Sequence, residues 1–218
     1  MSTPAPKPPT PASPDPLVIR HLDYLGPMAT RDGWRPIHER PEVAFVGRSN
    51  VGKSSLLNRL MRRKAFARVS NTPGRTREIH FFDVNRTFVL ADLPGYGYAR
   101  ISKARQAEWR PLIEGFLRDS LQLRGVVQLL DVRHDPTADD FTMLEFLAEL
   151  GVPTILAATK IDKLTPAKAR ERLATVATQV GADPDQLVPF SAVTGEGRDD
   201  LAQALVDLLA QPTWRTGT

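Results

Sequence analysis

Short apolar runs alternate with amphipathic stretches along most of the chain, and this alternation predicts its secondary structure. The runs that are typical of buried strands are EVAFVG (42–47), GVVQLLD (125–131), VPTILAAT (152–159) and LVPFSA (187–192). Apolar residues recur at helical spacing over residues 53–63, 139–150 and 198–210. In the helix predicted over 139–150, this spacing places Phe141, Leu144 and Leu147 on the buried face.

A hairpin is predicted where IHFFDV (79–84) and TFVLAD (87–92) flank an Asn-Arg pair, because strands this close in sequence need a tight turn. Strands that alternate with helices favour a mostly parallel sheet covered on both faces. We therefore expect a three-layer α/β fold with six strands, in which ligands bind at the carboxyl ends of the strands.

The chain divides into four predicted parts. Residues 1–16 are rich in proline and poor in core-forming side chains, which predicts a disordered tail. Residues 17–40 are an extension that is expected to pack on the domain. Residues 41–212 form the domain itself, and residues 213–218 are a C-terminal tail.

Composition and charge narrow the class of protein. Cysteine is absent, which excludes disulfides and thiolate metal sites. No apolar run approaches the roughly 20 residues of a membrane span, and no signal-peptide pattern opens the chain, so a cytoplasmic protein is expected. Residues 48–125 hold 16 Lys/Arg against six Asp/Glu, whereas residues 126–218 hold eight against 14. This segregation suggests a polyanionic partner, with a solvated basic face as the alternative.

The stretch GRSNVGKSSLLNRL (47–60) follows a predicted strand and opens a predicted helix. Its Gly-x-x-x-x-Gly-Lys-Ser spacing is that of a loop whose backbone N–H groups surround phosphates. Lys53 is expected to reach the β- and γ-phosphates, and the Ser54 hydroxyl to bind Mg²⁺. The expected nucleotide contacts of this loop are Gly47, Arg48, Ser49, Asn50, Val51, Gly52, Lys53 and Ser54.

Three later strand ends carry further candidate residues. In DLPG (92–95), Asp92 can hold magnesium through water, and the Gly95 N–H can face the γ-phosphate. In TKID (159–162), Asp162 can accept hydrogen bonds from N1–H and the 2-amino group of guanine, a donor pair that adenine lacks. The stem of Lys160 can cover the base. The backbone of FSA (190–192) can meet the guanine O6.

The candidate contacts at these strand ends are therefore Asp92, Leu93, Pro94, Gly95, Thr159, Lys160, Ile161, Asp162, Phe190, Ser191 and Ala192. All occur in chain order at predicted strand ends, which indicates a GTP-binding protein. An ATP-using kinase is the weaker interpretation, because Asp162 would be left unpaired by adenine.

These stretches, together with TPGRT (72–76), FFDV, DLPGYGYA (92–99) and DVRH (131–134), resemble the EngB (YihA/YsxC) family of translation-factor-related P-loop GTPases. The resemblance covers about residues 40–210, and TPGRT followed by DLPGYGYA is specific to the family. It implies the P-loop GTPase fold and GTP hydrolysis with Mg²⁺. It also implies a role in assembly of the large ribosomal subunit, and a link to cell division and septation.

The resemblance also assigns roles to single residues. Thr76 is expected to bind Mg²⁺ in the GTP state, so the implied metal ligands are Ser54, Thr76 and Asp92. The implied mobile loop over the γ-phosphate comprises Gly74, Arg75, Thr76, Arg77 and Glu78. The residues expected to act in hydrolysis are Lys53, Thr76, Gly95 and Asn50.

Two positions depart from common GTPases. Thr159 stands where Asn is usual and has no amide to tie its loop to the phosphate loop, so modest nucleotide affinity is expected. Tyr96 stands where many GTPases place a Gln that orients water, so slow intrinsic hydrolysis is expected. Help can come from K⁺ held by the Asn50 carbonyl, or from Arg75 and Arg77. The alternatives are that Asn50 only structures its loop and that the arginines contact RNA or solvent.

The sequence thus predicts a monomeric GTP-dependent switch without a membrane partner, acting on a large-subunit precursor with its rRNA and ribosomal proteins. Basic residues flank both expected switch loops: Arg59, Arg62, Arg63, Lys64 and Arg68 before the first, and Arg100, Lys103 and Arg105 after the second. The alternative is a signalling GTPase that binds a protein partner and no RNA.

Overall fold

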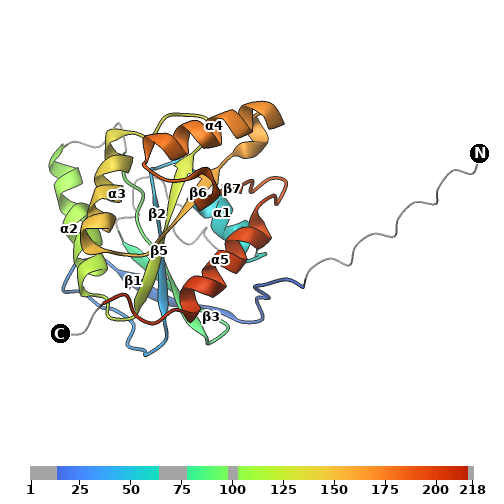
Figure 1. Ribbon diagram of the computed structural model, residues 1–218. Coiled ribbons are helices and arrows are strands. Elements are labelled where there is room, and N and C mark those ends of the chain that lie inside the picture. The colour runs from blue at the N-terminus through green and yellow to red at the C-terminus, as the bar shows by residue number, and fades with distance from the viewer. Residues whose placement is uncertain (1–13, 64–77, 98–102, 216–218) are drawn as a thin grey trace, which may run out of the picture.

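The computed structural model describes residues 14–63, 78–97 and 103–215 and shows a central sheet between two helical layers (Figure 1). The strands are β1 (Leu22–Met28), β2 (Glu42–Gly47), β3 (Ile79–Val84), β4 (Phe88–Asp92), β5 (Leu123–Asp131), β6 (Thr154–Thr159) and β7 (Leu187–Phe190). The helices are α1 (Lys53–Leu60), α2 (Lys103–Asp119), α3 (Ala138–Leu150), α4 (Pro166–Gln179) and α5 (Arg198–Ala210). Short 3₁₀ turns occur at Ile161–Lys163 and Pro184–Gln186.

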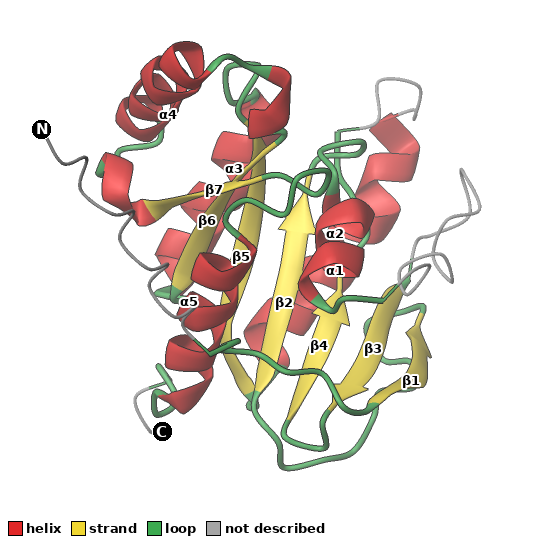
Figure 2. Cartoon of the chain, turned by 90° about the vertical axis from the view of Figure 1, so that its right-hand side faces the viewer, coloured by secondary structure: helices red, strands yellow, loops and turns green. Residues whose placement is uncertain are grey.

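The strands lie in the order β1-β3-β4-β2-β5-β6-β7, and only β3 runs against its neighbours (Figure 2). The α/β class and the mostly parallel sheet are confirmed, but the expected count of six strands was wrong. The additional strand, β1, pairs antiparallel with β3 at the edge of the sheet. Gly26 and Pro27 interrupt its alternation of apolar and polar side chains, and an edge strand tolerates such residues.

The two faces of β2 show how the layers form. Val43 and Phe45 pack with the apolar faces of α1 and α5, whereas Ala44 and Val46 pack with those of α2 and α3. Successive strand residues point to opposite faces, so a run that is apolar at every position is buried on both sides. This is why the apolar run EVAFVG forms a central strand.

The hairpin prediction is confirmed. Asn85 and Arg86 form the turn between β3 and β4 with φ angles of 54° and 57°, the left-handed pair that a two-residue hairpin turn requires.

Two helices, α1 and α3, differ in detail from the prediction. Helix α1 ends at Leu60 rather than at residue 63, since Arg62 has a φ of 50°.

The buried face of α3 also differs from the prediction. Met143, Phe146 and Leu147 are buried together with Asp140, while Phe141 and Leu144 are only half-buried. Asp140 accounts for the rotation, because its carboxylate points inward to a buried hydroxyl described below. Apolar spacing alone placed the buried face too far toward Phe141.

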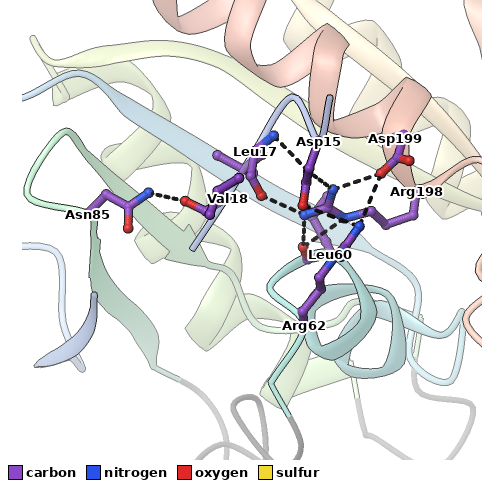
Figure 3. A network of polar contacts seen from close by, with 8 residues as sticks. All are labelled: Asp15, Leu17, Val18, Leu60, Arg62, Asn85, Arg198 and Asp199. Carbon is purple, nitrogen blue, oxygen red and sulfur yellow. Dashed lines mark hydrogen bonds and ion pairs between the residues drawn. The ribbon is translucent and has the colours of Figure 1, made fainter. Parts of the chain in front are cut away.

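A segment that precedes β1 lies across the end of α1, and we call residues 15–21 the strap. Its backbone is held by Asn85, whose amide donates to Val18 O at 2.7 Å (Figure 3). The side-chain carbonyl of Asn85 also accepts from Arg20 N at 2.7 Å. Leu17 is buried in the core with α1 and α5. The strap therefore joins the hairpin turn to two helices that are distant in sequence.

Arg198, the first residue of α5, holds the other end of the strap (Figure 3). Its guanidinium is 4% exposed; it contacts the Asp15 carboxylate and donates to Leu17 O at 2.7 Å and to Leu60 O at 3.0 Å. Arg62 adds an exposed ion pair to Asp15 at 3.2 Å. One buried cation thus fixes the strap, the end of α1 and the start of α5 together.

The C-terminal residues that the structure describes lie against the end of α2. Trp214 Nε1 donates to Leu123 O at 2.9 Å, and Arg215 donates to Ser120 O and Leu117 O at 3.0 and 2.8 Å. Arg215 thus satisfies carbonyls that the helix end leaves without partners. Among the residues described, no helix is long and apolar enough to cross a membrane.

Candidate nucleotide-binding site

The sequence-predicted contacts meet where β2, β4, β6 and β7 end, at one edge of the sheet (Figure 2). Hydrogen bonds join the loops that follow these strands. Ser49 N donates to Tyr96 O at 2.7 Å, which links the phosphate loop to the segment after β4. Within the described residues, Glu78 directly precedes β3 beside this edge, and its carboxylate lies 4.0 Å from His80 Nε2. Gly74, Arg75, Thr76 and Arg77 lie outside the described residues.

The phosphate loop bends through two left-handed residues, Asn50 with a φ of 63° and Gly52 with a φ of 107°. Glycine adopts such angles without a Cβ penalty, and here Gly52 directly precedes the first turn of α1. A Cβ on Gly47 would lie 3.0 Å from Leu129 and Val51, so this position also has little room for a side chain. The loop can therefore present its backbone N–H groups at the start of α1.

Lys53 and Asp92 form an ion pair at the centre of this edge. Their side chains are 13% and 2% exposed, so both charges are largely removed from bulk water. Lys53 begins α1 and Asp92 ends β4, which places the expected phosphate ligand beside the expected magnesium ligand. Ser54 follows Lys53 in the first turn of α1.

Asp162, the residue expected to read guanine, is held by Ser191, whose hydroxyl donates to Asp162 Oδ1 at 2.8 Å. Ser191 is fully buried, and its Oγ accepts from Val193 N and Thr194 N. Burial raises the pKa of Asp162, but the Ser191 hydrogen bond and the nearby Lys163 ammonium outweigh it and lower the pKa overall. The carboxylate is ionised at neutral pH, as an acceptor for two N–H groups must be.

The expectation that Thr159 leaves its loop untied was wrong. Thr159 Oγ1 donates to Val51 O at 2.7 Å, so a hydroxyl makes the connection to the phosphate loop that an amide was expected to make. Lys160 adds a second connection, because its ammonium donates to Asn50 O at 2.6 Å. The absence of an Asn amide at position 159 is therefore no longer a reason to expect modest nucleotide affinity.

The DVRH stretch predicts no role for Asp131, and the structure gives it one. Its carboxylate accepts from Lys160 Nζ at 2.8 Å and from Arg133 at 2.8 and 2.9 Å. Burial raises the pKa of Asp131, but these hydrogen bonds outweigh it and hold the pKa at about 2. Asp131 thus orients the lysine whose stem is expected to cover the base; its place at a strand end was the available signal.

Tyr96 points away from this edge into the core and is 2% exposed. Its hydroxyl donates to Asp140 Oδ1 at 2.7 Å and accepts from Gln128 Nε2. The side chain therefore cannot orient a water molecule at the phosphates, in agreement with the expectation that Tyr does not replace the usual Gln.

Three arginines of the predicted basic rim contact other parts of the chain. Arg59 donates to Ala192 O at 2.8 Å and to Val193 O, so it ties α1 to the loop after β7. Arg62 pairs with Asp15 and Asp199 at 3.2 and 3.7 Å. Lys64, Arg68 and Arg100 lie outside the described residues. Arg63 is exposed beyond the end of α1, and its guanidinium donates to Ile19 O of the strap at 3.4 Å.

Comparison with known proteins decides the family. A family model described as "50S ribosome-binding GTPase" matches residues 42–160. A relative from Gemmatimonas aurantiaca, "Probable GTP-binding protein EngB", is 74% identical over 200 residues, which are 92% of this chain and 98% of that protein. The chain belongs to the EngB family of GTP-binding proteins. It is a GTPase: it binds GTP and hydrolyses it.

Other relatives agree with this assignment. An Exiguobacterium protein with the same description is 46% identical over 196 residues, covering 89% of this chain and 99% of its own. The crystal structure of a probable GTP-binding protein engB superposes with a TM-score of 0.65 at 27% identity, covering 77% of this chain and 98% of that one. Era from Aquifex aeolicus, bound to GDP and aluminium fluoride, gives a TM-score of 0.61 at 23% identity over 80% of this chain and 58% of its own, a likeness of fold.

Proposed function

We propose that this GTPase is a molecular switch that assists assembly of the large ribosomal subunit in the cytoplasm, with a link to cell division and septation. The observation that carries the proposal is the charge segregation: 16 Lys/Arg against six Asp/Glu fall within residues 48–125, the segment that also contains both expected switch loops. A family model described by 50S ribosome binding supports the same partner. RNA phosphates would be neutralised by such a segment.

The donor set at the sheet edge fits magnesium. Asp92 supplies a buried carboxylate and Ser54 a hydroxyl in the first turn of α1, and Mg²⁺ prefers oxygen ligands of this kind while keeping several waters. We expect Ser54 and, in the GTP state, Thr76 to hold the ion, with Asp92 acting through water. The ion would neutralise charge on the β- and γ-phosphates.

The ion pair between Lys53 and Asp92 suggests how the site receives both ligands. A triphosphate gives Lys53 an anionic partner, and Mg²⁺ gives Asp92 a cationic one, so each group can exchange its present partner for a ligand of the same sign. Neither buried charge is then left unpaired. An unpaired charge would cost several kcal/mol in a dry environment.

Asn50 is our candidate for holding K⁺ during hydrolysis. Its backbone carbonyl already accepts from Lys160. Its exposed side-chain amide has a second carbonyl, which is available to coordinate the ion. We expect faster phosphate release in potassium than in sodium at equal ionic strength, because a cation there offsets the developing negative charge. Asn50→Ala should remove the difference while GDP binding persists. Equal rates in both salts would leave Arg75, Arg77 or the ribosome as the source of catalysis.

The ribosomal partner is tested by pelleting the protein with large-subunit precursors, loaded with a non-hydrolysable GTP analogue or with GDP. We expect the GTP form to pellet preferentially and its binding to weaken steeply with salt, because released counterions drive contacts to phosphates. Arg63→Glu should weaken pelleting several-fold without changing nucleotide affinity, since Arg63 lies beyond the end of α1.

The matched control is Arg170→Glu, which reverses an exposed arginine on α4, in the acidic part of the chain. It should pellet like the unaltered protein. Arg62 is the poorer choice, because Glu at position 62 would repel Asp15 and Asp199 and disturb the strap. Binding that ignores both salt and nucleotide would overturn the RNA proposal and favour the protein-binding alternative.

A further inference from the structure

We propose that Tyr96 and Asp140 are positioning residues that hold the Gly95 amide in place for the γ-phosphate, so that α3 sets the preference for GTP over GDP. The inference deepens the proposed function, because it rests on the expected contact between Gly95 and the γ-phosphate. The Tyr96 side chain is buried in the core and would act on the γ-phosphate only through the backbone.

The backbone around Gly95 is held against the phosphate loop on both sides. Tyr96 O accepts from Ser49 N at 2.7 Å, and Tyr96 N donates to Gly47 O at 3.3 Å. A Cβ on Gly95 would lie 3.3 Å from Ser49 N and Cα, so the two loops are in close contact. The direction of the Gly95 N–H therefore depends on where residue 96 is fixed.

The side chain of Tyr96 is fixed by buried polar groups from two elements. Its hydroxyl donates to Asp140 Oδ1 at 2.7 Å and accepts from Gln128 Nε2, and Gln128 and Asp140 are 0% and 5% exposed. Burial and the Asp140 carboxylate raise the pKa of Tyr96 well above 10, so the hydroxyl keeps its proton and donates. Buried hydrogen bonds to a charged acceptor are among the stronger ones in proteins.

Asp140 in turn is fixed by the start of α3. Its second oxygen, Oδ2, accepts from Thr137 N and Thr137 Oγ1, both at 2.8 Å, in the capping box of the helix. One carboxylate thus serves both the helix cap and the tyrosine. A displacement of the first turn of α3 would therefore move Tyr96 as well, through the two oxygens of the Asp140 carboxylate.

Gly97 marks where this anchored segment passes the same helix. Its φ is 70°, and a Cβ there would lie 2.8 Å from Arg48 Cγ and 3.0 Å from Asp139 Oδ2. The chain after Tyr96 therefore passes between the phosphate loop and the first turn of α3. Anchored residues 95–97 are the last described residues before the expected second switch.

The test compares the affinities of Tyr96→Phe for GDP and for a non-hydrolysable GTP analogue. The variant keeps the buried ring and loses only the hydroxyl. We expect analogue binding to weaken about tenfold and GDP binding to change less than about twofold, because small misplacements of a contact group cost this much and only the analogue carries a γ-phosphate. Turnover should fall mainly through a higher KM for GTP, because the weakened contact is already made by bound GTP.

Asp140→Ala should shift the affinity ratio in the same direction as Tyr96→Phe. Thr142→Ala is the control: it removes an exposed hydroxyl of α3 that donates only to Ala138 O in its own helix, and it leaves Asp140 and Tyr96 untouched, so the ratio should stay unchanged. Equal loss of GDP and analogue affinity in Tyr96→Phe would show a merely structural role and overturn the inference. If the unaltered protein bound GDP and the GTP analogue equally well, the expected contact between the Gly95 amide and the γ-phosphate would be wrong.

Discussion

Asp162→Asn is expected to weaken binding of GTP and GDP by about a hundredfold and to create affinity for xanthosine nucleotides. The carboxylate is expected to accept two hydrogen bonds from guanine, and losing two hydrogen bonds to a charged acceptor costs on the order of 3 kcal/mol. The geometry also fixes the orientation of the new amide. Ser191 Oγ accepts from two backbone N–H groups, so its proton must go to Oδ1, and the Asn carbonyl would occupy that place.

The Asn amide nitrogen would then stand where Asp162 Oδ2 stands and could donate to the 2-oxo group of xanthine. Equilibrium binding of labelled GDP and XDP to the same preparation measures the exchange of preference. Asp200→Asn, at an exposed position on α5, is the matched control and should bind GDP normally. Unchanged guanine-nucleotide binding by Asp162→Asn would end the assignment of guanine to this residue.

Arg198→Met is expected to lower the free energy of unfolding by about 3 kcal/mol, the lower end for removing one partner of a buried ion pair. The lower end applies because the Asp15 side chain remains 19% exposed. Met retains much of the buried stem but leaves the Leu17 and Leu60 carbonyls without the guanidinium that they accept from. An unmade buried hydrogen bond costs more than a made one contributes.

Urea unfolding at a fixed GDP concentration measures this loss as a shift of the midpoint at constant slope. Arg170→Met removes an exposed arginine from α4 and should change stability by less than about 0.5 kcal/mol. A loss below 1 kcal/mol in Arg198→Met would mean that the strap is held by Leu17 and Asn85 rather than by the buried cation.

The meeting of the candidate nucleotide contacts at one edge of the sheet was predictable because their motifs are local. The phosphate loop, DLPG, TKID and FSA each combine a strand end with residues only a few positions apart, and parallel strands bring such ends to one edge. The same reasoning failed at Thr159, where a hydroxyl performs what an amide was expected to do. It gave no role to Asp131, whose partner Lys160 is 29 residues away.

The missed elements have physical reasons of their own. Strand β1 carries Gly26 and Pro27, and it is stabilised by pairing with a strand more than 50 residues later, which no local pattern reveals. The patterns above do not predict α2 and α4 either; Pro111 lies inside α2, and in α4 the buried residues are only Val176 and Ala177. The inward turn of Tyr96 depends on Asp140, 44 residues away.

The strap has a consequence for how the chain is made. Asp15 and Arg198 are 183 residues apart, so the contact between them cannot form until α5 has been synthesised. At roughly 5–20 residues per second, Asp15 waits about 10–40 s for its partner. During that time Leu17 and the end of α1 lack the cover that α5 supplies. Closure of the strap is thereby coupled to synthesis of α5, and a chain that stops short of α5 would keep this surface open to proteases and chaperones.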